Sequence, residues 1–344
     1  MEFRKNNTLN ILKGVACIAV VFIHVQFPGI FGQVIVGLSR AAVPLFFMIS
    51  GYYLYRNDPS EIRSKMPRKL KKIALLTLWA LVLYFLWGSF TRFWGGGWGS
   101  VVGWYADLFT WDSLFRFVVL SEDVVAGHLW FLIALFEAYL LFWLLHVVKF
   151  DRYAWIVAFV LLECHIVIMT LSNVLSWGIS MTIFRSVWFD GLPFLVLGYT
   201  FKLYEESLNL HIKTLLCIIA AILGVICTVI ERLLVGNLQV FQGTLLFGLA
   251  VFLLAIRYPS TKHPKMLMIL GEKYSSHIYV YHWLVRELFI KLQDVLMINN
   301  LIFEWLEPIG VFLVTLIGVV ILIYVKNIIY CFFQNRRKTS SHEQ

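Results

Sequence analysis

Long apolar runs recur along this chain, and each has about the length of a helix that crosses a lipid bilayer. Such a helix needs roughly 20 mostly apolar residues, because each residue adds about 1.5 Å and the hydrocarbon core is about 30 Å thick. Ten segments meet this requirement, at residues 9–27, 34–55, 73–92, 128–148, 153–171, 183–201, 212–231, 240–257, 274–293 and 308–330. Only 14% of the 344 residues are charged and 60% are hydrophobic, which excludes a soluble globular enzyme. The sequence therefore predicts an all-α integral membrane protein with about ten transmembrane helices.

Lysine and arginine residues are distributed unequally between the two sides of these segments. If the N-terminus is cytoplasmic, 21 of the 29 cations fall on the cytoplasmic side and 6 on the outer side, while Lys13 and Arg40 lie within spans. This bias follows the positive-inside rule and predicts that both termini are cytoplasmic. The net charge of +9 is then mainly an orientation signal, and nucleic acid is not expected as a partner.

The domain organisation is predicted to be simple. Residues 1–330 form one transmembrane domain, and residues 331–344 form a short polar cytoplasmic tail. The longest gap between spans, 93–127, begins with a glycine run and predicts an extramembrane loop with an interfacial segment, such as 104–120. The first apolar stretch is interpreted as an uncleaved helix, because Lys13 and His24 interrupt it and no small-x-small site follows. The five cysteines lack metal-ligand spacing, so no metal is expected.

Two ionisable residues on the first predicted helix are candidates for function, because a charge within a span costs about 2.5–3.5 kcal/mol to insert. Lys13 and His24 are eleven residues apart, about three helical turns, so both project from one face with an axial separation of roughly 16 Å. A plainer alternative is that Lys13 snorkels to the interface and His24 makes a hydrogen bond between helices. Arg40, in the second span, needs a carboxylate, carbonyl oxygens or an anionic ligand because it cannot lose its charge.

Other polar side chains are expected at a depth similar to that of Arg40. They come from later spans and comprise His128, Trp130, Arg185, Asp190, His282 and Arg286, with Glu137, Glu163 and His165 deeper. Together with His24 they predict a polar cavity that opens to the outside. A purely structural alternative for Arg185 and Asp190 is a plain ion pair. The corresponding alternative for Arg286 and Glu287 is an interfacial anchor.

A basic segment, SKMPRKLKKIA, lies between the second and third spans. Within eight residues it contains Lys65, Arg68, Lys69, Lys71 and Lys72. One interpretation is that the run binds anionic lipid or only enforces topology. The sharper one is a cradle for a phosphorylated cytosolic ligand. A phosphate-binding inner face and a cavity lined by histidine and arginine on the outer side together suit chemistry across a membrane.

At these residues the sequence resembles the acyltransferase 3 family of bacterial integral membrane acyltransferases, over nearly the whole chain. Lys13 and His24 are similar to the family's first-helix pattern of a basic residue, ten residues and a histidine. The stretch RAAVPLFFMISGYYLY resembles the family's Arg…Pro-Phe-Phe-Phe…Ser-Gly-Phe segment. The basic segment resembles its Arg-x-x-Arg motif, as Arg68-x-x-Lys71 or Lys69-x-x-Lys72. Three later segments resemble the family in the right order: GHLWFLIALFEAYL, FDGLPFLVLGY and LGEKYSSHIYVYHWLV.

The resemblance implies transfer of an acyl group, usually acetyl, from cytosolic acyl-CoA to a hydroxyl of an envelope glycan or lipid-linked sugar. The implied location is the bacterial plasma membrane. The similar branches are stand-alone proteins that acetylate surface sugars and the membrane half of vancomycin-resistance serine racemases. Implied catalytic residues are His24, as general base or transient acyl carrier, with Lys13, Arg40 and His128. The acetyl-CoA phosphates would be held by Arg68, Lys69, Lys71 and Lys72, and the acceptor, more weakly, by Arg185, Asp190, His282, Trp130 and Glu137.

Two rival functions come from other classes. A transporter or flippase also has many helices around a polar cavity, but the sequence contains no inverted repeat and no paired Gly/Pro-broken helices in two halves. An inactive relative that serves as a membrane scaffold or sensor is the other rival. It gives no reason for Lys13 and His24 to share one helix face.

Overall fold

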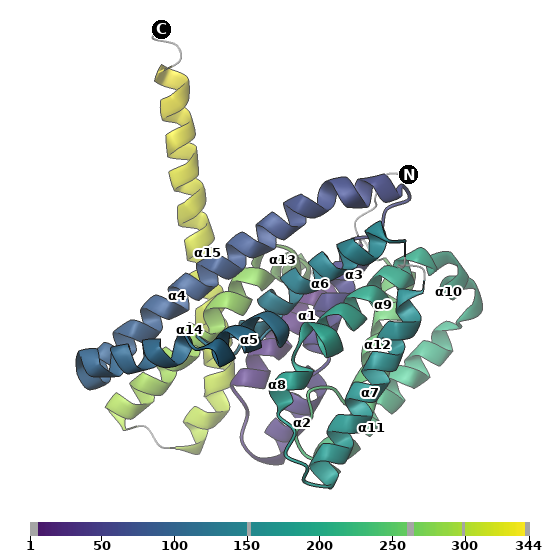
Figure 1. The fold of residues 1–344 in the computed structure, drawn as a ribbon, viewed down its shortest axis with the longest axis horizontal. Coiled ribbons are helices and arrows are strands. Elements are labelled where there is room, and N and C mark those ends of the chain that lie inside the picture. The colour runs from purple at the N-terminus through teal and green to yellow at the C-terminus, as the bar shows by residue number, and fades with distance from the viewer. Residues whose placement is uncertain (1–5, 150–152, 260–264, 298–299, 341–344) are drawn as a thin grey trace.

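The computed structural model describes residues 6–149, 153–259, 265–297 and 300–340, and every regular element in this part of the chain is a helix (Figure 1). Seven helices here are long and apolar enough to cross a bilayer: Asn7–His24, Gly29–Tyr52, Pro59–Leu108, Trp130–Val147, Ala154–Val174, Thr214–Leu234 and Leu301–Cys331. A shorter apolar helix spans Gln242–Arg257. The predicted all-α membrane protein is confirmed, while the count of ten spans and the side of each terminus stay predictions.

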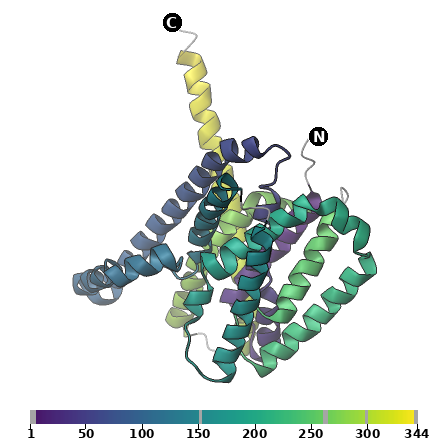
Figure 2. The same ribbon diagram turned by 45° about the vertical axis from the view of Figure 1, so that its right-hand side comes forward.

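Helices occupy each of the ten predicted spans. They are α1 (Asn7–His24), α2 (Gly29–Ser39) with α3 (Ala42–Tyr52), α4 (Pro59–Leu108), α6 (Trp130–Val147), α7 (Ala154–Val174), α9 (Leu192–Leu203), α11 (Thr214–Leu234), α12 (Gln242–Arg257), α14 (Ser275–Leu296) and α15 (Leu301–Ser340). The remaining elements are short: α5 (Trp111–Val119), α8 (Met181–Phe184), α10 (Glu205–His211), α13 (Lys265–Ile269) and the π-helices η1 (Val187–Gly191) and η2 (Leu270–Tyr274). α1 lies within the bundle, against α2, α3, α12, η2, α14 and α15 (Figure 2).

The second predicted span is divided into α2 and α3 at Arg40 and Ala41. Pro44 has no N–H to donate to the carbonyl of Arg40, four residues earlier, and its ring crowds that carbonyl. The helix therefore ends at Ser39, and α3 starts afresh with Pro44 in its first turn, where no N–H is needed. The break leaves the Arg40 side chain buried inside the bundle rather than on a continuous helix face.

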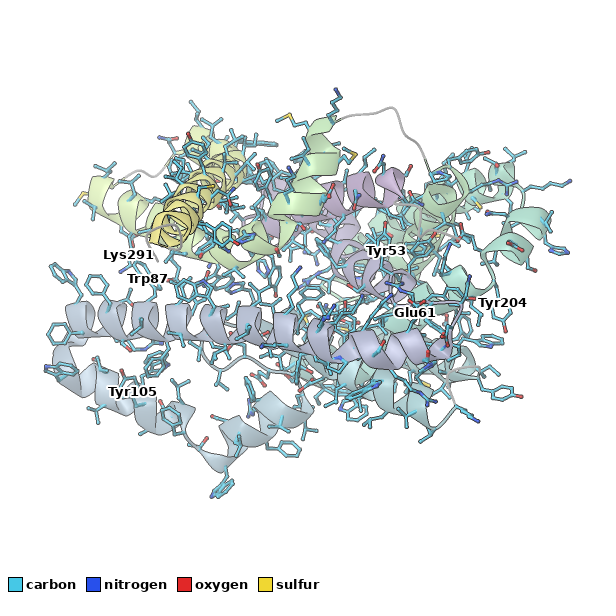
Figure 3. All side chains as sticks on the ribbon, turned by 90° about the horizontal axis from the view of Figure 1, so that it is seen from above. Tyr53, Glu61, Trp87, Tyr105, Tyr204 and Lys291 are labelled. Carbon is cyan, nitrogen blue, oxygen red and sulfur yellow. The ribbon has the colours of Figure 1, made fainter. Side chains whose placement is uncertain are left out.

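α4 differs from the predicted loop after residue 93, because the helix continues to Leu108 with a single interruption at Gly97. Gly97 has φ of 67°, a left-handed conformation that glycine adopts readily. Beyond it the chain doubles back, so that the ring of Tyr105 stacks on Phe85 with centroids 5.0 Å apart (Figure 3). The gap thus begins as a helical hairpin, and α5 provides the second part of the expected interfacial segment.

The C-terminal helix α15 extends well beyond the rest of the bundle (Figures 1 and 2). It continues without interruption to Ser340, so the predicted polar tail at 331–344 begins as a helical extension of the last span. Residues 341–344 lie outside the described residues.

Backbone contacts at glycine hold the central helices together. A Cβ added at Gly51 of α3 would overlap the carbonyl oxygen of Leu195, and one at Gly198 of α9 would overlap that of Met48. α3 and α9 therefore meet backbone to backbone, as small residues allow in membrane helices. This contact fixes the position of α3, which directly follows Arg40.

Gly198→Ala is expected to destabilise the protein by about 1–3 kcal/mol, because the added methyl group forces α3 and α9 apart. Thermal unfolding of the purified protein in detergent measures the loss. Gly248→Ala in α12 is the matched control, since a Cβ there meets no other atom within 4 Å. Equal melting temperatures for the two variants would contradict this account of the α3–α9 contact.

Candidate functional site

Helix α1 connects the two groups of polar residues expected from the sequence. It starts at the N-cap Asn6, whose side chain accepts a hydrogen bond from the N–H of Leu9 at 3.1 Å. Lys13, one turn further on, is half-buried and lies within electrostatic range of Lys72 and Glu272. His24 ends the helix, with Val25 in extended conformation after it.

His24 belongs to a cluster of three histidines and Trp283. Its ring centroid lies 5.3 Å from that of His282, 6.4 Å from that of His128 and 5.3 Å from Trp283. The rings of His128 and Trp283 stack with centroids 5.1 Å apart, and His128 meets His282 edge to face at 5.3 Å. The C-terminal end of α1, the residues just before α6 and the interior of α14, which are far apart in sequence, thus converge on one point.

The three histidines differ in how much freedom they retain. His282 is fully buried, and its Nδ1 lies 2.8 Å from the carbonyl oxygen of Tyr279 and 3.1 Å from that of Ile278. Because carbonyl oxygens only accept, Nδ1 carries the proton in neutral His282, and Nε2 is left with its lone pair. His128 is also buried, whereas His24 is only partly buried and lines a cavity.

The position of His128 is set by tyrosines and by the turn that precedes it. The Tyr279 hydroxyl donates to the carbonyl oxygen of His128, and the ring of Tyr84 packs against the imidazole with centroids 4.9 Å apart. Before the helix, the Asp123 carboxylate accepts hydrogen bonds from the N–H groups of Val125 and Ala126, each at 2.9 Å. Burial raises the pKa of Asp123 to about 6.

A buried network joins Arg40 to Arg185 through Gln239. Nη1 of Arg40 donates to Oε1 of Gln239 at 3.3 Å, and Nε of Arg185 donates to the same oxygen at 2.9 Å. The Gln239 amide donates in turn to Oδ2 of Asp190 at 3.0 Å. Asp190 therefore balances the two arginines through a neutral amide rather than through a direct ion pair.

Asp190 is positioned by the π-helix η1. Pro193, in the first turn of α9, has no N–H for the carbonyl of residue 189, and the preceding turn is correspondingly widened. Asp190 is completely buried, with its Oδ1 3.5 Å from Nδ1 of His165. The predicted pair Arg185–Asp190 thus forms part of a larger network that includes His165.

A small cavity of about 30 Å³ connects the histidine cluster to this network. Its lining includes His24, Arg40, His128, Trp130, Arg185 and Gln239. A volume of this size holds one or two water molecules. Of the residues expected to line one polar cavity, His24, Arg40, His128, Trp130 and Arg185 do line it, and Gln239 joins them.

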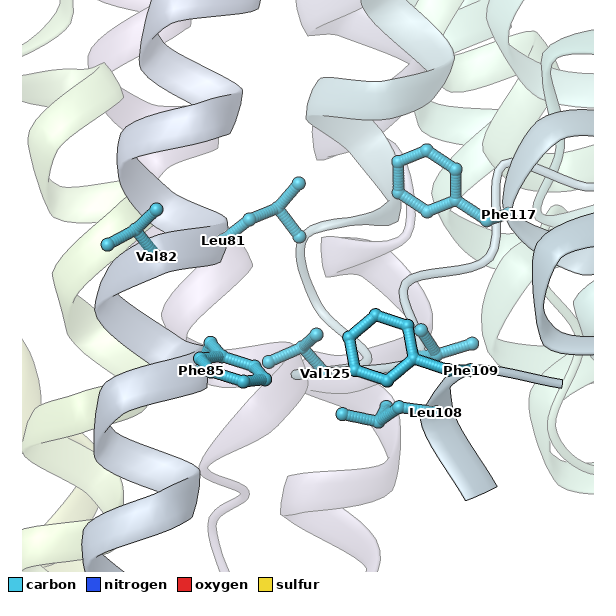
Figure 4. Close-up of a pocket in the computed structure, with 8 residues that line it drawn as sticks. Leu81, Val82, Phe85, Leu108, Phe109, Phe117 and Val125 are labelled. Atoms are coloured by element: carbon cyan, nitrogen blue, oxygen red, sulfur yellow. The ribbon is translucent and has the colours of Figure 1, made fainter. Parts of the chain in front are cut away.

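Larger hollows on the molecule are apolar and lie elsewhere. One of about 350 Å³ is lined by Leu81, Phe85, Phe109 and other apolar side chains of α4 and α5 (Figure 4). Another, of about 480 Å³, lies between α4, α6 and η1 and includes Glu137. Their apolar walls suit contact with lipid, so we place the chemistry in the smaller polar cavity. Glu137 does not line that cavity, and its carboxylate instead accepts a hydrogen bond from the Ser121 hydroxyl.

The predicted basic segment lies on the first turns of α4, where Asp58 caps the helix by accepting from the N–H of Ser60 at 2.8 Å. Lys69 is half-buried, with Nζ 3.4 Å from the carbonyl oxygen of Tyr53. Lys72, one turn on, lies within electrostatic range of both Lys69 and Lys13.

The two registers of the predicted basic motif are separated by their direction on the helix. Arg68, Lys71 and Lys72 are all exposed, whereas Lys69 is half-buried, contacts the end of α3 and also lies over the ring of Tyr139 in α6, at 5.7 Å. In the Lys69-x-x-Lys72 pair, Lys69 faces the bundle and the exposed Lys72 lies within electrostatic range of Lys13 on α1. Arg56 adds a further cation within electrostatic range of Lys69.

Sequence reasoning missed several residues that complete the site, namely Trp283, Tyr84, Tyr279 and Gln239. The positions of Trp283 and Tyr279, next to and three residues before His282, were the available signals. Gln239 carries no charge and precedes a predicted span, so no pattern singled it out. Arg286 lies over the Trp283 ring at 4.6 Å, beside the histidine cluster rather than within the cavity.

Comparison with known proteins identifies one family. Residues 6–325 match the family model described as an acyltransferase domain, Acyl_transf_3. No curated protein and no solved structure matches the chain.

Gln239→Leu is expected to destabilise the protein by about 3 kcal/mol, because it leaves two guanidinium groups and a carboxylate buried without the amide that joins them. Thermal unfolding in detergent measures the effect. Gln242→Leu is the matched control, since Gln242 is exposed and its side-chain amide donates to the carboxylate of Glu163, at 2.6 Å, outside the arginine network. A loss no greater than that of the control would show that the network does not depend on Gln239.

Proposed function

This chain belongs to the acyltransferase 3 family and is a membrane acyltransferase, and we propose that it moves an acetyl group from cytosolic acetyl-CoA to a hydroxyl of an envelope glycan or lipid-linked sugar. The observation that carries the proposal is that α1 joins a basic cluster at Lys13 to a histidine cluster at His24. The proposed location is the plasma membrane of a bacterium, with both termini in the cytoplasm.

The donor is proposed to bind at the Lys13 end of α1. Lys69 and Lys72 offer charge-assisted hydrogen bonds to the CoA phosphates, and Arg56 and Lys13 lie close enough to add to the positive potential. The pantetheine arm then runs along α1 towards His24, an axial distance of roughly 16 Å. The face of α1 between the two ends carries only small or medium side chains, Cys17, Val20 and Val21.

In the proposed reaction, His24 accepts the proton of the acceptor hydroxyl as the hydroxyl oxygen forms a bond to the thioester carbonyl carbon. Arg40 and His128 stabilise the negative charge that develops on the carbonyl oxygen. The C–S bond then breaks, and the sulfur of CoA takes the proton from His24, so that the base is restored. His282 supports His24 by packing beside it, with ring centroids 5.3 Å apart and its own tautomer fixed by the backbone.

A transient acyl-His24 is the alternative form of the same reaction. Acid quenching of the protein after mixing with acetyl-CoA, followed by intact mass measurement, separates the two. An added acetyl group that is lost in His24→Ala indicates the acyl carrier, and its absence indicates general base catalysis.

His24→Ala is expected to lower acetyl transfer by a factor of about 10²–10⁴, the usual contribution of a positioned general base. Transfer of labelled acetyl from acetyl-CoA to envelope glycan in membranes measures the rate. His211→Ala, in the exposed helix α10, is the matched control and should transfer normally. Full activity of correctly inserted His24→Ala protein would overturn the assignment of His24.

Lys69→Gln/Lys72→Gln is expected to raise the KM for acetyl-CoA by about tenfold or more, through the loss of charge-assisted bonds to phosphate. Arg68→Gln/Lys71→Gln removes the same charge from the other register and should change KM by less than about threefold. Initial rates at varied acetyl-CoA concentration compare the two. A larger effect of the second pair would place the donor on the opposite side of α4.

A further inference from the structure

The charges around the outer cavity do not balance. Arg40 and Arg185 both line it, and the acid within electrostatic range of both is Asp190. A third cation, Arg232, lies within range of Arg40 and is partly exposed. Buried charges are normally paired, so an excess of cations in a cavity indicates a site for an anion.

In the described part of the chain, the hydrogen bonds of both guanidinium groups go to acceptors other than carboxylates. Arg40 donates to Gln239 and to Oδ1 of the exposed Asn237 at 3.0 Å, while its buried Nε has no acceptor in the described part of the chain. Arg185 donates to Gln239 and to the thioether sulfur of Met181, at 2.9 Å. Amide oxygens and a thioether are weaker partners for a guanidinium than carboxylate or phosphate oxygens.

The two guanidinium groups are arranged to take one ligand together. Gln239 Oε1 accepts from both, so they lie on either side of a single amide oxygen. Arg185 is only partly buried and Arg40 is almost fully buried, so burial increases from the first arginine to the second, from the surface inward. The same cavity is lined by His24, so a ligand on the arginines lies next to the proposed base.

We propose that the acyl acceptor is an anionic saccharide, whose carboxylate or phosphate group is bound by Arg40 and Arg185 while a neighbouring hydroxyl is presented to His24. The inference rests on the proposed function, because it assigns the acceptor of that reaction. Arginine suits this recognition because its planar group binds an anionic oxygen pair in a fixed direction. The transferred acetyl forms an ester with the hydroxyl, and the anionic group takes no part in bond making or breaking.

The test compares three soluble sugars that differ only at carbon 6: methyl glucoside, methyl glucuronoside and methyl glucoside 6-phosphate. Each is added to the purified full-length protein with acetyl-CoA, and the concentration that half-maximally changes acetyl-CoA consumption is measured. At least one anionic sugar is expected to act at a concentration about tenfold or more below that of the neutral one. The more effective of the two distinguishes a carboxylate acceptor from a phosphate acceptor.

Arg185→Gln should bring the three concentrations to within about twofold of one another, whereas Arg116→Gln, in α5 away from the cavity, should keep the preference. Equal action of the three sugars on wild-type protein, or no action of either anion, overturns the anionic acceptor. Absence of any acetyl-CoA consumption, with envelope glycan also supplied, overturns the proposed function instead. A fall in kcat without loss of the anion preference in Arg185→Gln would assign that arginine to charge stabilisation and also overturn the proposal.

Discussion

The need to satisfy every polar group that enters hydrocarbon governs this structure. Regular helices meet that need through their own backbone bonds, and irregular backbone is tolerated only where protein surrounds it. The chain departs from the α-helix inside the bundle at Arg40–Ala41, at η1 and at η2. The first two departures place Arg40 and Asp190, and the third leads directly into α14, which carries His282. The proposed chemistry thus lies where the backbone is irregular and shielded from lipid.

Helix α1 transmits this arrangement from one side of the bundle to the other. A Cβ added at Gly14 would overlap the carbonyl oxygen of Leu267, and one at Gly271 would overlap that of Asn10, so α1 lies directly on the backbone of α13 and η2. Close backbone approach allows little sliding between elements. Because Lys13 and His24 belong to one rigid helix, any displacement that admits a donor at one end also shifts the base at the other.

The parts of this fold and site that depend on local spacing could be predicted from the sequence. Lys13 and His24 share a helix face because the helical period decides it, and Pro44 indicates a distortion at the carbonyl four residues earlier. Depth along a span, however, does not give the direction of a side chain. That is why Glu137 was grouped with the cavity residues, although the structure places it in an apolar groove.

Other features depended on tertiary contacts that no local pattern contains. Both registers of the basic motif have the same spacing, and only the packing of α4 against α3 and α6 separates them. The glycine run after residue 93 predicted a loop because glycine is a poor helix former, whereas stacking of Tyr105 on Phe85 stabilises a helical hairpin. Gln239 lacks a charge, so its role became visible only with two arginines beside it.

The size of the cavity sets a last constraint on how an acceptor reaches His24. About 30 Å³ admits a hydroxyl or a water molecule but not a sugar ring. The ring must therefore stay at the mouth, where Arg185 and Asn237 are reachable from outside, unless α2 or η1 moves. Discrimination between acceptors then falls to Arg185 at the mouth and Arg40 behind it, while His24 and His128 act on the hydroxyl that enters the cavity. A narrow cavity also limits the water that reaches the acyl group, which protects the thioester from hydrolysis while the acceptor is absent.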